Sequence, residues 1–391
     1  SPMVTINLWA KVGVIEEEPD KIGISHFFEH MLFKGTKNYP ALELSRQVQA
    51  IGGSINAGTS FDTTDFYIVV PTEQWKQALI LITELVMNPL FDPEDIEREK
   101  KIIAQEIHLD EDDPEERLVL TLYKEVFSGT PYERSILGTE ETIHRLKRED
   151  FILHHQNFYH PSNLTMVVCG DVSENQFLDE IERLFVTGSK PANPIFRLFP
   201  PLPQVKERRI DISMDINHHY GVIGFTGPGI KQEDIFILRF LSVLLGDGIG
   251  SRLNIRLREK EQLVDSIHTN YTYYQEAGVF SVIYTFADED SNKIEDFIRE
   301  VFNGFLYNSP IYVFFFRAIN IFFSGFYHSI ETTLGSAELL GRLDTIDTID
   351  VIFHYMNIIQ SIRSDHIIEA FQKYLDFNRA VTVLIKPEDR Q

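Results

Sequence analysis

Three residues between positions 23 and 36 have the types and the spacing of a metal-dependent active site. His26 and His30 are four residues apart, so a helix would place both imidazoles on one face, one turn apart, within reach of a single metal ion. Glu29 lies beside them and is free to act as a base. The alternative is a helix whose histidines only pack against neighbours and whose glutamate faces water.

Zinc is the metal that suits such a set of side chains. A hydrolytic Zn²⁺ site uses three protein ligands and keeps a fourth position open for water. The bound ion lowers the pKa of water to about 7, and a nearby carboxylate takes the proton and passes it to the leaving amine. His26 and His30 supply two ligands and Glu29 the base, so the third ligand must come from elsewhere in the chain.

A second helix carries the remaining carboxylates of interest. Asp92 is a good N-cap and Pro93 suits the first helical position, and the helix is predicted to continue to about residue 107. Glu99 and Glu106 are seven residues apart, so they share one face of this helix. Taken alone, a glutamate in such a charged helix is better explained as a solvated surface residue.

The sequence HFFEHMLFKGT at residues 26–36 resembles the zinc motif of the pitrilysin family, whose inverted H-x-x-E-H motif is shared by mitochondrial processing peptidase, insulin-degrading enzyme and bacterial processing proteases. Glu106 and Glu99 match the third zinc ligand of that family and the carboxylate seven residues before it. The resemblance implies His26, His30 and Glu106 as Zn²⁺ ligands and Glu29 as general base. It also implies that Glu99 orients a ligand without binding the metal.

Residues 52–60 resemble the edge strand that lies beside the zinc ion in this family. The resemblance implies that an extended peptide substrate pairs with this strand through backbone hydrogen bonds. Asn56, Ala57, Gly58 and Thr59 are the substrate-binding residues that follow from it. An ordinary strand inside a sheet is the alternative.

One position departs from the family pattern. Active members carry an arginine on a helix of the second half and, seven residues later, a tyrosine, and both are thought to hold the substrate. Arg258 matches the arginine and is a further predicted substrate-binding residue, but Asp265 replaces the tyrosine and cannot donate a hydrogen bond as a neutral phenol does. We therefore expect the zinc-bearing subunit of a dimer, either a homodimer or a heterodimer with a related subunit that supplies the Arg/Tyr pair.

The predicted elements follow one order in both halves of the chain. Apolar residues alternate in the strands and recur at helical spacing between them, and each half closes with a helix followed by an apolar strand. We predict the α+β class with two duplicated domains, each a mainly antiparallel sheet with helices packed on one face. Residues 1–187 form the zinc-bearing domain and residues 207–391 the second domain, and the Pro-rich residues 188–206 link them.

Charge and hydropathy narrow the set of partners. The net charge of −23 argues against nucleic acid and is compatible with the attraction of basic peptides. The apolar residues 311–326 are interrupted by Arg317 and Asn320, which predicts a buried helix rather than a membrane span, with a subunit interface as the alternative. We expect no membrane partner and a soluble protein, and favour the cytoplasm over the periplasm or an organelle. Because the family usually has a strand before Val4, the start of the chain is expected to be trimmed or disordered.

These observations together predict a zinc metalloendopeptidase that hydrolyses unfolded peptides or presequences inside a chamber closed by two such chains. The alternative from another functional class is a non-catalytic scaffold or peptide-binding subunit of the same family. The intact H-x-x-E-H motif favours the enzyme.

Overall fold

The computed structural model describes residues 2–185, 199–287, 291–307, 311–352, 358 and 361–388. Residues 188–198 of the predicted linker lie outside the described residues. The chain forms two compact units, each assembled from three segments. The first unit comprises Ser1–Leu109, Arg134–Leu198 and Tyr327–Ile349, and the second comprises Asp110–Glu133, Phe199–Phe326 and Asp350–Gln391.

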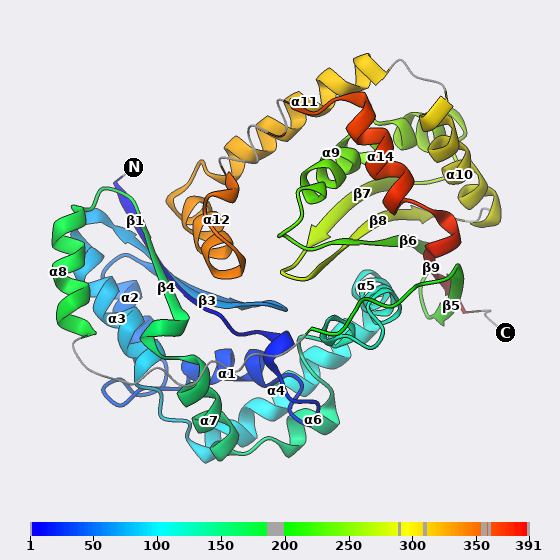
Figure 1. Ribbon diagram of the computed structural model, residues 1–391. Helices are drawn as coiled ribbons and strands as arrows, with labels where there is room; N and C mark the ends of the chain where they lie inside the picture. Colours follow the sequence, from blue (N-terminus) through cyan, green and yellow to red (C-terminus); the bar gives the residue numbers. More distant parts are fainter. Residues whose placement is uncertain are drawn as a thin grey trace. The chain divides into compact units, whose positions relative to one another are not determined.

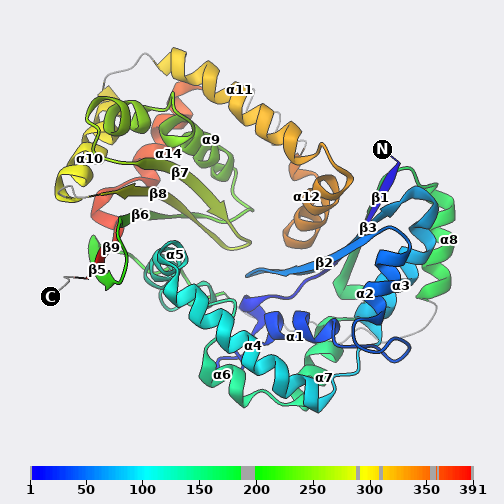
Figure 2. The same ribbon diagram turned by 180° about the vertical axis from the view of Figure 1, so that it is seen from behind.

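Figures 1 and 2 show the elements from two sides. The strands are β1 Met3–Ala10, β2 Ser54–Thr59, β3 Thr64–Pro71, β4 Leu164–Cys169, β5 Arg208–Met214, β6 His219–Pro228, β7 Ser266–Tyr273, β8 Ala277–Phe286 and β9 Val381–Pro387. The helices are α1 Ile24–Leu32, α2 Glu43–Ala50, α3 Trp75–Met87, α4 Pro93–Asp112, α5 Pro114–Val126, α6 Glu140–Arg145, α7 Arg148–Phe158, α8 Glu174–Leu184, α9 Asp234–Gly246, α10 Ser291–Tyr307, α11 Ile311–Ser329, α12 Thr333–Ile346 and α14 Ser364–Tyr374, with a π-helical turn, η5, at Asn254–Lys260.

The first sheet has the strand order β2-β3-β1-β4, and every neighbouring pair is antiparallel. Strand β1 carries the alternating pattern that the sequence predicts. Val4, Ile6, Leu8 and Ala10 lie on one face and belong to a core that also contains the apolar residues of α1 and α3. This core is the platform on which α1, with its two histidines, is held.

The opposite face of the same sheet is covered by α12, which comes from the far end of the sequence. Trp9 lies so close to Gly341 that a Cβ atom there would be 2.0 Å from the indole nitrogen. Thr5 donates a hydrogen bond to Thr333 at 2.9 Å, and Thr165 donates one to Asp344 at 2.9 Å. The first sheet is therefore covered on both faces, which corrects the prediction that helices pack on one face only.

The second sheet repeats the first. Its order is β5-β9-β6-β8-β7, so β7-β8-β6-β9 corresponds to β2-β3-β1-β4, and only the additional strand β5 is parallel to its neighbour. Phe225 points to the face covered by α10, where it contacts Phe302, and Gly224 points to the other face, where Leu122 of α5 lies against it. Figure 1 shows α5 on the side of this sheet opposite to α9 and α14. The α+β class and the duplication are confirmed.

The compact units differ from the predicted domains because the two halves exchange one helix each. Helix α5 precedes the predicted linker but belongs to the second unit, and α12 follows the linker but belongs to the first. The physical reason is that each sheet has a second face that needs cover, and a helix from the other half of the sequence supplies it. The repeat pattern marks each half but contains no signal for such an exchange.

Residues 140–158 form two helices, α6 and α7, because Leu146 between them has an extended backbone. Helix α11 is only partly buried: among its described side chains Ala318 and Phe322 are buried, but Phe316 is 67% exposed. The prediction of a buried helix at 311–326 is therefore wrong for that side. Among the helices that the structure describes, none is long and apolar enough to cross a membrane.

Asp65 is an ionisable residue on the face of the first sheet that α12 covers. It is paired with Trp9 of β1 and Gly58 of β2 in the strand register, and Glu338 of α12 is among its charged neighbours. Burial raises the pKa of Asp65 from its ordinary value of 3.8 to about 7, and the Glu338 charge adds to the rise. As the pH rises, the Asp65 carboxyl group therefore loses its proton at a lower pH in the unfolded chain than in the folded chain.

We expect Asp65→Asn to stabilise the protein more at pH 8 than at pH 4. Since the folded pKa is raised, stability falls as the pH rises from about 4 to about 7, and the amide removes that loss. Thermal unfolding of the wild type and the variant at both pH values measures the difference. Asp171→Asn, at an exposed position, is the control. An equal change in Tm at both pH values would contradict the interpretation.

Candidate metal centre

Helix α1 is held at its N-terminus by a buried carboxylate. Glu17 is 2% exposed and accepts hydrogen bonds from the backbone N–H groups of Gly23 and Ser25, both at 2.8 Å. Gly23 itself has a φ of 91°, and a Cβ atom there would lie 2.6 Å from the Leu137 carbonyl oxygen. Glu17 therefore binds N–H groups that α1 leaves unpaired, at the positive end of the helix dipole.

The apolar residues of α1 determine which of its sides faces the site. They are all buried in the core of the first unit: Ile24, Phe27, Phe28, Met31 and Leu32. Because these residues fill one side, His26, Glu29 and His30 are placed together on the other. The imidazole rings of His26 and His30 have centroids 4.4 Å apart, as expected for neighbours one turn apart.

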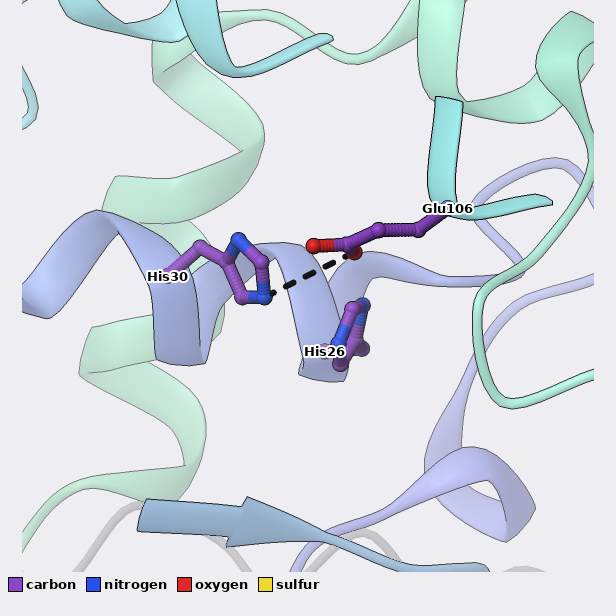
Figure 3. Close-up of side chains that lie close together, drawn as sticks. All are labelled: His26, His30 and Glu106. Atoms are coloured by element: carbon purple, nitrogen blue, oxygen red, sulfur yellow. Dashed lines mark ion pairs between the residues drawn. The ribbon is translucent and has the colours of Figure 1, made fainter. Parts of the chain in front are cut away.

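Helix α4 brings a carboxylate to these two rings. One ligand atom each of His26, His30 and Glu106 can be chosen so that all three lie within 4.8 Å of one another. Figure 3 shows the two histidines on α1 and Glu106 on α4, with the ion pair between His30 Nε2 and Glu106 Oε2 at 3.8 Å. Ligand atoms of a tetrahedral zinc ion are about 3.4 Å apart, so small side-chain movements would close this set around a metal.

Glu99 lies two turns before Glu106 on α4. It determines which nitrogen of His30 is available to bind a metal. His30 Nδ1 lies 2.9 Å from Glu99 Oε1, and Lys34 Nζ lies 2.6 Å from Glu99 Oε2. Despite the burial of Glu99, these two partners lower the pKa of its carboxyl group. An ionised carboxylate can only accept, so Nδ1 carries the hydrogen and Nε2 keeps a free lone pair toward Glu106.

The histidines are protonated to different degrees. Burial and the neighbouring His30 lower the pKa of His26 to about 4, against the opposing charge of Glu99. Burial also disfavours the charged form of His30, but the Glu99 hydrogen bond and the Glu106 charge outweigh it and raise the pKa. The neutral imidazole is the metal-binding form, so His26 is ready to bind a metal at neutral pH. A protonated His30 would have to release its proton in order to bind a metal.

Buried polar atoms without partners indicate that these side chains suit a metal ion. Within the described chain, His26 Nδ1 and Glu106 Oε2 are buried and have no hydrogen-bond partner. Buried polar atoms are normally paired, and a role in binding an ion is one recognised reason for an exception. Two imidazoles and one carboxylate also match the donor set of hydrolytic zinc sites. The residues present therefore fit Zn²⁺.

Glu29 is next to the three candidate ligands and has one partner of its own. The Thr59 hydroxyl donates a hydrogen bond to Glu29 Oε2 at 2.6 Å. Burial raises the pKa of Glu29 and the Glu106 charge adds to it, while the Thr59 bond and His30 act in the opposite direction. Glu29 Oε1 is the oxygen that this bond leaves free.

An open cleft of about 520 Å³ lies beside these groups. Glu29 and His30 line it together with Lys34, Glu99 and Asn56 of β2. Strand β2 stands at the end of the strand order, so no described strand pairs with its outer edge. An extended peptide can add there through backbone hydrogen bonds.

The predicted substrate-binding residues are placed differently from one another. Asn56, Ala57, Gly58 and Thr59 are all on β2, but only Asn56 lines the cleft. Thr59 points instead to Glu29. Arg258 is exposed in η5 of the second unit, and Asp265 directly precedes β7. The contact of Arg258 with substrate stays a prediction.

Sequence reasoning missed three contributors to this site: Glu17, Lys34 and the Thr59 side chain. Glu17 belongs to the acidic residues 16–20, and nothing in that stretch distinguishes the one that becomes buried. Lys34 was inside the recognised motif, four residues after His30, and helical spacing could have suggested its approach to the same side of α1. The Thr59 side chain gives no local signal.

The sequence matches two protein-family models in succession. The model described as "Insulinase (Peptidase family M16)" matches residues 1–140, and the one described as "Peptidase M16 inactive domain" matches residues 145–310. An uncharacterized zinc protease from Rickettsia bellii is 33% identical over 303 residues, which cover 77% of this chain and 71% of the relative. An uncharacterized zinc protease from Bacillus subtilis, YmxG, is 29% identical, and the matched residues cover 71% of this chain and 67% of the relative.

The fold occurs in solved structures as well. A protease from Helicobacter pylori superposes with a TM-score of 0.92 at 22% identity, over 99% of this chain and 94% of that one. At this identity the likeness speaks for the two-domain fold alone.

We expect Glu99→Gln to weaken Zn²⁺ binding by roughly 10- to 100-fold, because the amide cannot replace the charged acceptor that orients His30. Titration of the purified protein with Zn²⁺ against a competing chelator measures the affinity. Glu97→Gln, which changes an exposed glutamate on the same helix, is the control and is expected to bind Zn²⁺ normally. Equal affinities for both variants would show that the Glu99–His30 contact does not orient the ligand.

Proposed function

The chain belongs to peptidase family M16, the insulinase family, and from this membership and the metal centre we propose that it is a zinc-dependent endopeptidase acting on unfolded peptides or presequences. The observation that carries the proposal is the approach of His26, His30 and Glu106 to one another, with Glu29 beside them. In this proposal the first three are zinc ligands and Glu29 is the general base.

The residues of the chain divide the work of the reaction. Zn²⁺, when bound, supplies Lewis-acid chemistry that acidifies water and polarises a carbonyl group. Glu29 accepts a proton from the attacking water at Oε1, since its Oε2 is held by Thr59, and delivers it to the leaving nitrogen. Glu99 keeps the His30 ring oriented, and Lys34 balances the charge of Glu99.

The open edge of β2 and the adjacent cleft support a peptide as substrate. A strand added to β2 is recognised through its backbone, so many sequences can bind in the same register. Asn56, Ala57, Gly58 and Thr59 supply that edge, and Asn56 also faces the cleft. A backbone-recognition site of this kind suits an enzyme for unfolded segments rather than for one folded protein.

The dimer and the enclosed chamber are part of the same proposal. Asp265 stands where the family carries a tyrosine, so we propose that this chain is the zinc-bearing subunit of a dimer, either a homodimer or a heterodimer with a related chain that supplies an Arg/Tyr pair. Arg258 is retained as a proposed substrate contact. The cytoplasm stays the predicted compartment.

A scaffold or peptide-binding subunit is the second candidate function. The observation that favours it is Asp265, together with the family model for residues 145–310, which is described as an inactive domain. The same metal centre would then bind zinc without turnover. Activity of the chain, measured alone and with a related partner chain, separates the two candidates.

We expect Glu29→Gln to retain about one zinc per chain and to lose cleavage of a quenched basic peptide, because the amide cannot carry the proton. His26→Ala is expected to lose the zinc as well, since it removes a ligand. Metal analysis and fluorescence assays of the purified chain, alone and with candidate partner chains, provide the measurements.

The control is His144→Ala, an exposed histidine of α6, which is expected to keep both zinc and activity. Zinc retained at full affinity by His26→Ala would overturn the ligand assignment. Zinc without cleavage in the wild type, under all partner conditions, would favour the scaffold.

A further inference from the structure

The side chain of Thr59 links the end of β2 to Glu29. Its hydroxyl donates to Glu29 Oε2 at 2.6 Å, within the range of a strong hydrogen bond to a carboxylate. A glutamate side chain has three rotatable bonds, so an unrestrained Glu29 would sample several positions. The Thr59 bond holds the carboxylate in one of these positions, beside the candidate ligands.

The position of Thr59 is itself fixed by a tight turn. Thr59 pairs with Thr64 in the register of β2 and β3, and the Ser60 N–H donates to the Thr63 carbonyl oxygen at 2.8 Å across the turn. The Ser60 and Thr63 hydroxyl groups lie 3.0 Å apart, and either can donate. The hairpin end is therefore closed by backbone and side-chain bonds together.

The loop after β1 holds this turn from outside. Ile15 N–H donates to the Phe61 carbonyl oxygen at 2.9 Å. A Cβ atom on Gly13 would lie 2.4 Å from the Ser60 carbonyl oxygen, so the loop and the turn are in direct backbone contact. Thr59 thus extends from a support that is anchored on two sides.

We propose that Thr59 is a positioning residue that holds the Glu29 carboxylate in place with one oxygen free, and so ties the base to the strand proposed to receive the substrate. The inference deepens the proposed function and rests on it. Because β2 also forms a wall of the cleft that Glu29 lines, substrate pairing and base placement share one rigid element.

The test compares Thr59→Val, which keeps the shape and removes the donor, with Thr59→Ser, which keeps the donor. We expect Thr59→Val to lower kcat roughly 10- to 100-fold, the range for loss of a hydrogen bond to a charged group, with KM and zinc content unchanged. Thr59→Ser is expected to restore most of the rate. A merely structural role would lower both variants together or change KM and Tm with kcat.

Thr5→Val is the matched control, because it removes a hydroxyl of the same sheet that bonds to Thr333 and not to Glu29. It is expected to leave kcat unchanged. An unchanged kcat in Thr59→Val, or an equal loss in Thr59→Val and Thr59→Ser, would overturn the proposal.

Crystal structures of zinc-free wild type and Thr59→Val give a readout that needs no activity. We expect the Glu29 carboxylate to leave its wild-type position in the valine variant, and an unmoved carboxylate would overturn the proposal. If the wild type cleaves no peptide, alone or with any candidate partner chain, the proposed function fails, but these two structures still decide whether Thr59 positions Glu29.

Discussion

The hydrogen bond between Glu99 and His30 is the contact on which the candidate metal centre depends. Glu99 is 3% exposed, and removing a carboxylate from water costs several kcal/mol unless partners replace the lost hydration. Those partners are His30 of α1 and Lys34, which lies just after the C-terminal end of α1. The charge of Glu99 can therefore be buried only if α1 and α4 lie together. That same approach brings Glu106 to the face of His26 and His30.

The second constraint is that each sheet needs cover on two faces. In the first unit α12 covers the face that carries Trp9, and in the second unit α5 covers the face that carries Gly224. Each of these helices comes from the other half of the sequence. The halves of the duplicated sequence are therefore not the units of packing, and contacts between distant parts of the chain must form before either sheet is complete.

The parts of the site that the sequence predicts are those fixed by local periodicity. The spacing of His26 and His30 places both rings on one side of α1, and the spacing of Glu99 and Glu106 does the same on α4. The family resemblance implies that α1 and α4 meet, and no local sequence pattern does. Glu17 is bound by backbone N–H groups six and eight residues further on, but its residue type looks like an ordinary solvated position. The cover of the first sheet by α12 depends on contacts far apart in the sequence.

In the proposed function, three glutamates of one chemical type take three different roles because their partners differ. Glu99 has both oxygens occupied, by His30 and Lys34, so it remains a fixed anion that orients a ring. Glu106 has a buried oxygen without a hydrogen-bond partner in the described chain, so it is free to bind a metal. Glu29 has one oxygen held by a hydroxyl and one free, which is the arrangement of a group that must take up and release a proton without moving. The division of labour follows from which oxygens are already bound, and side chains outside the motif, above all Thr59, determine that.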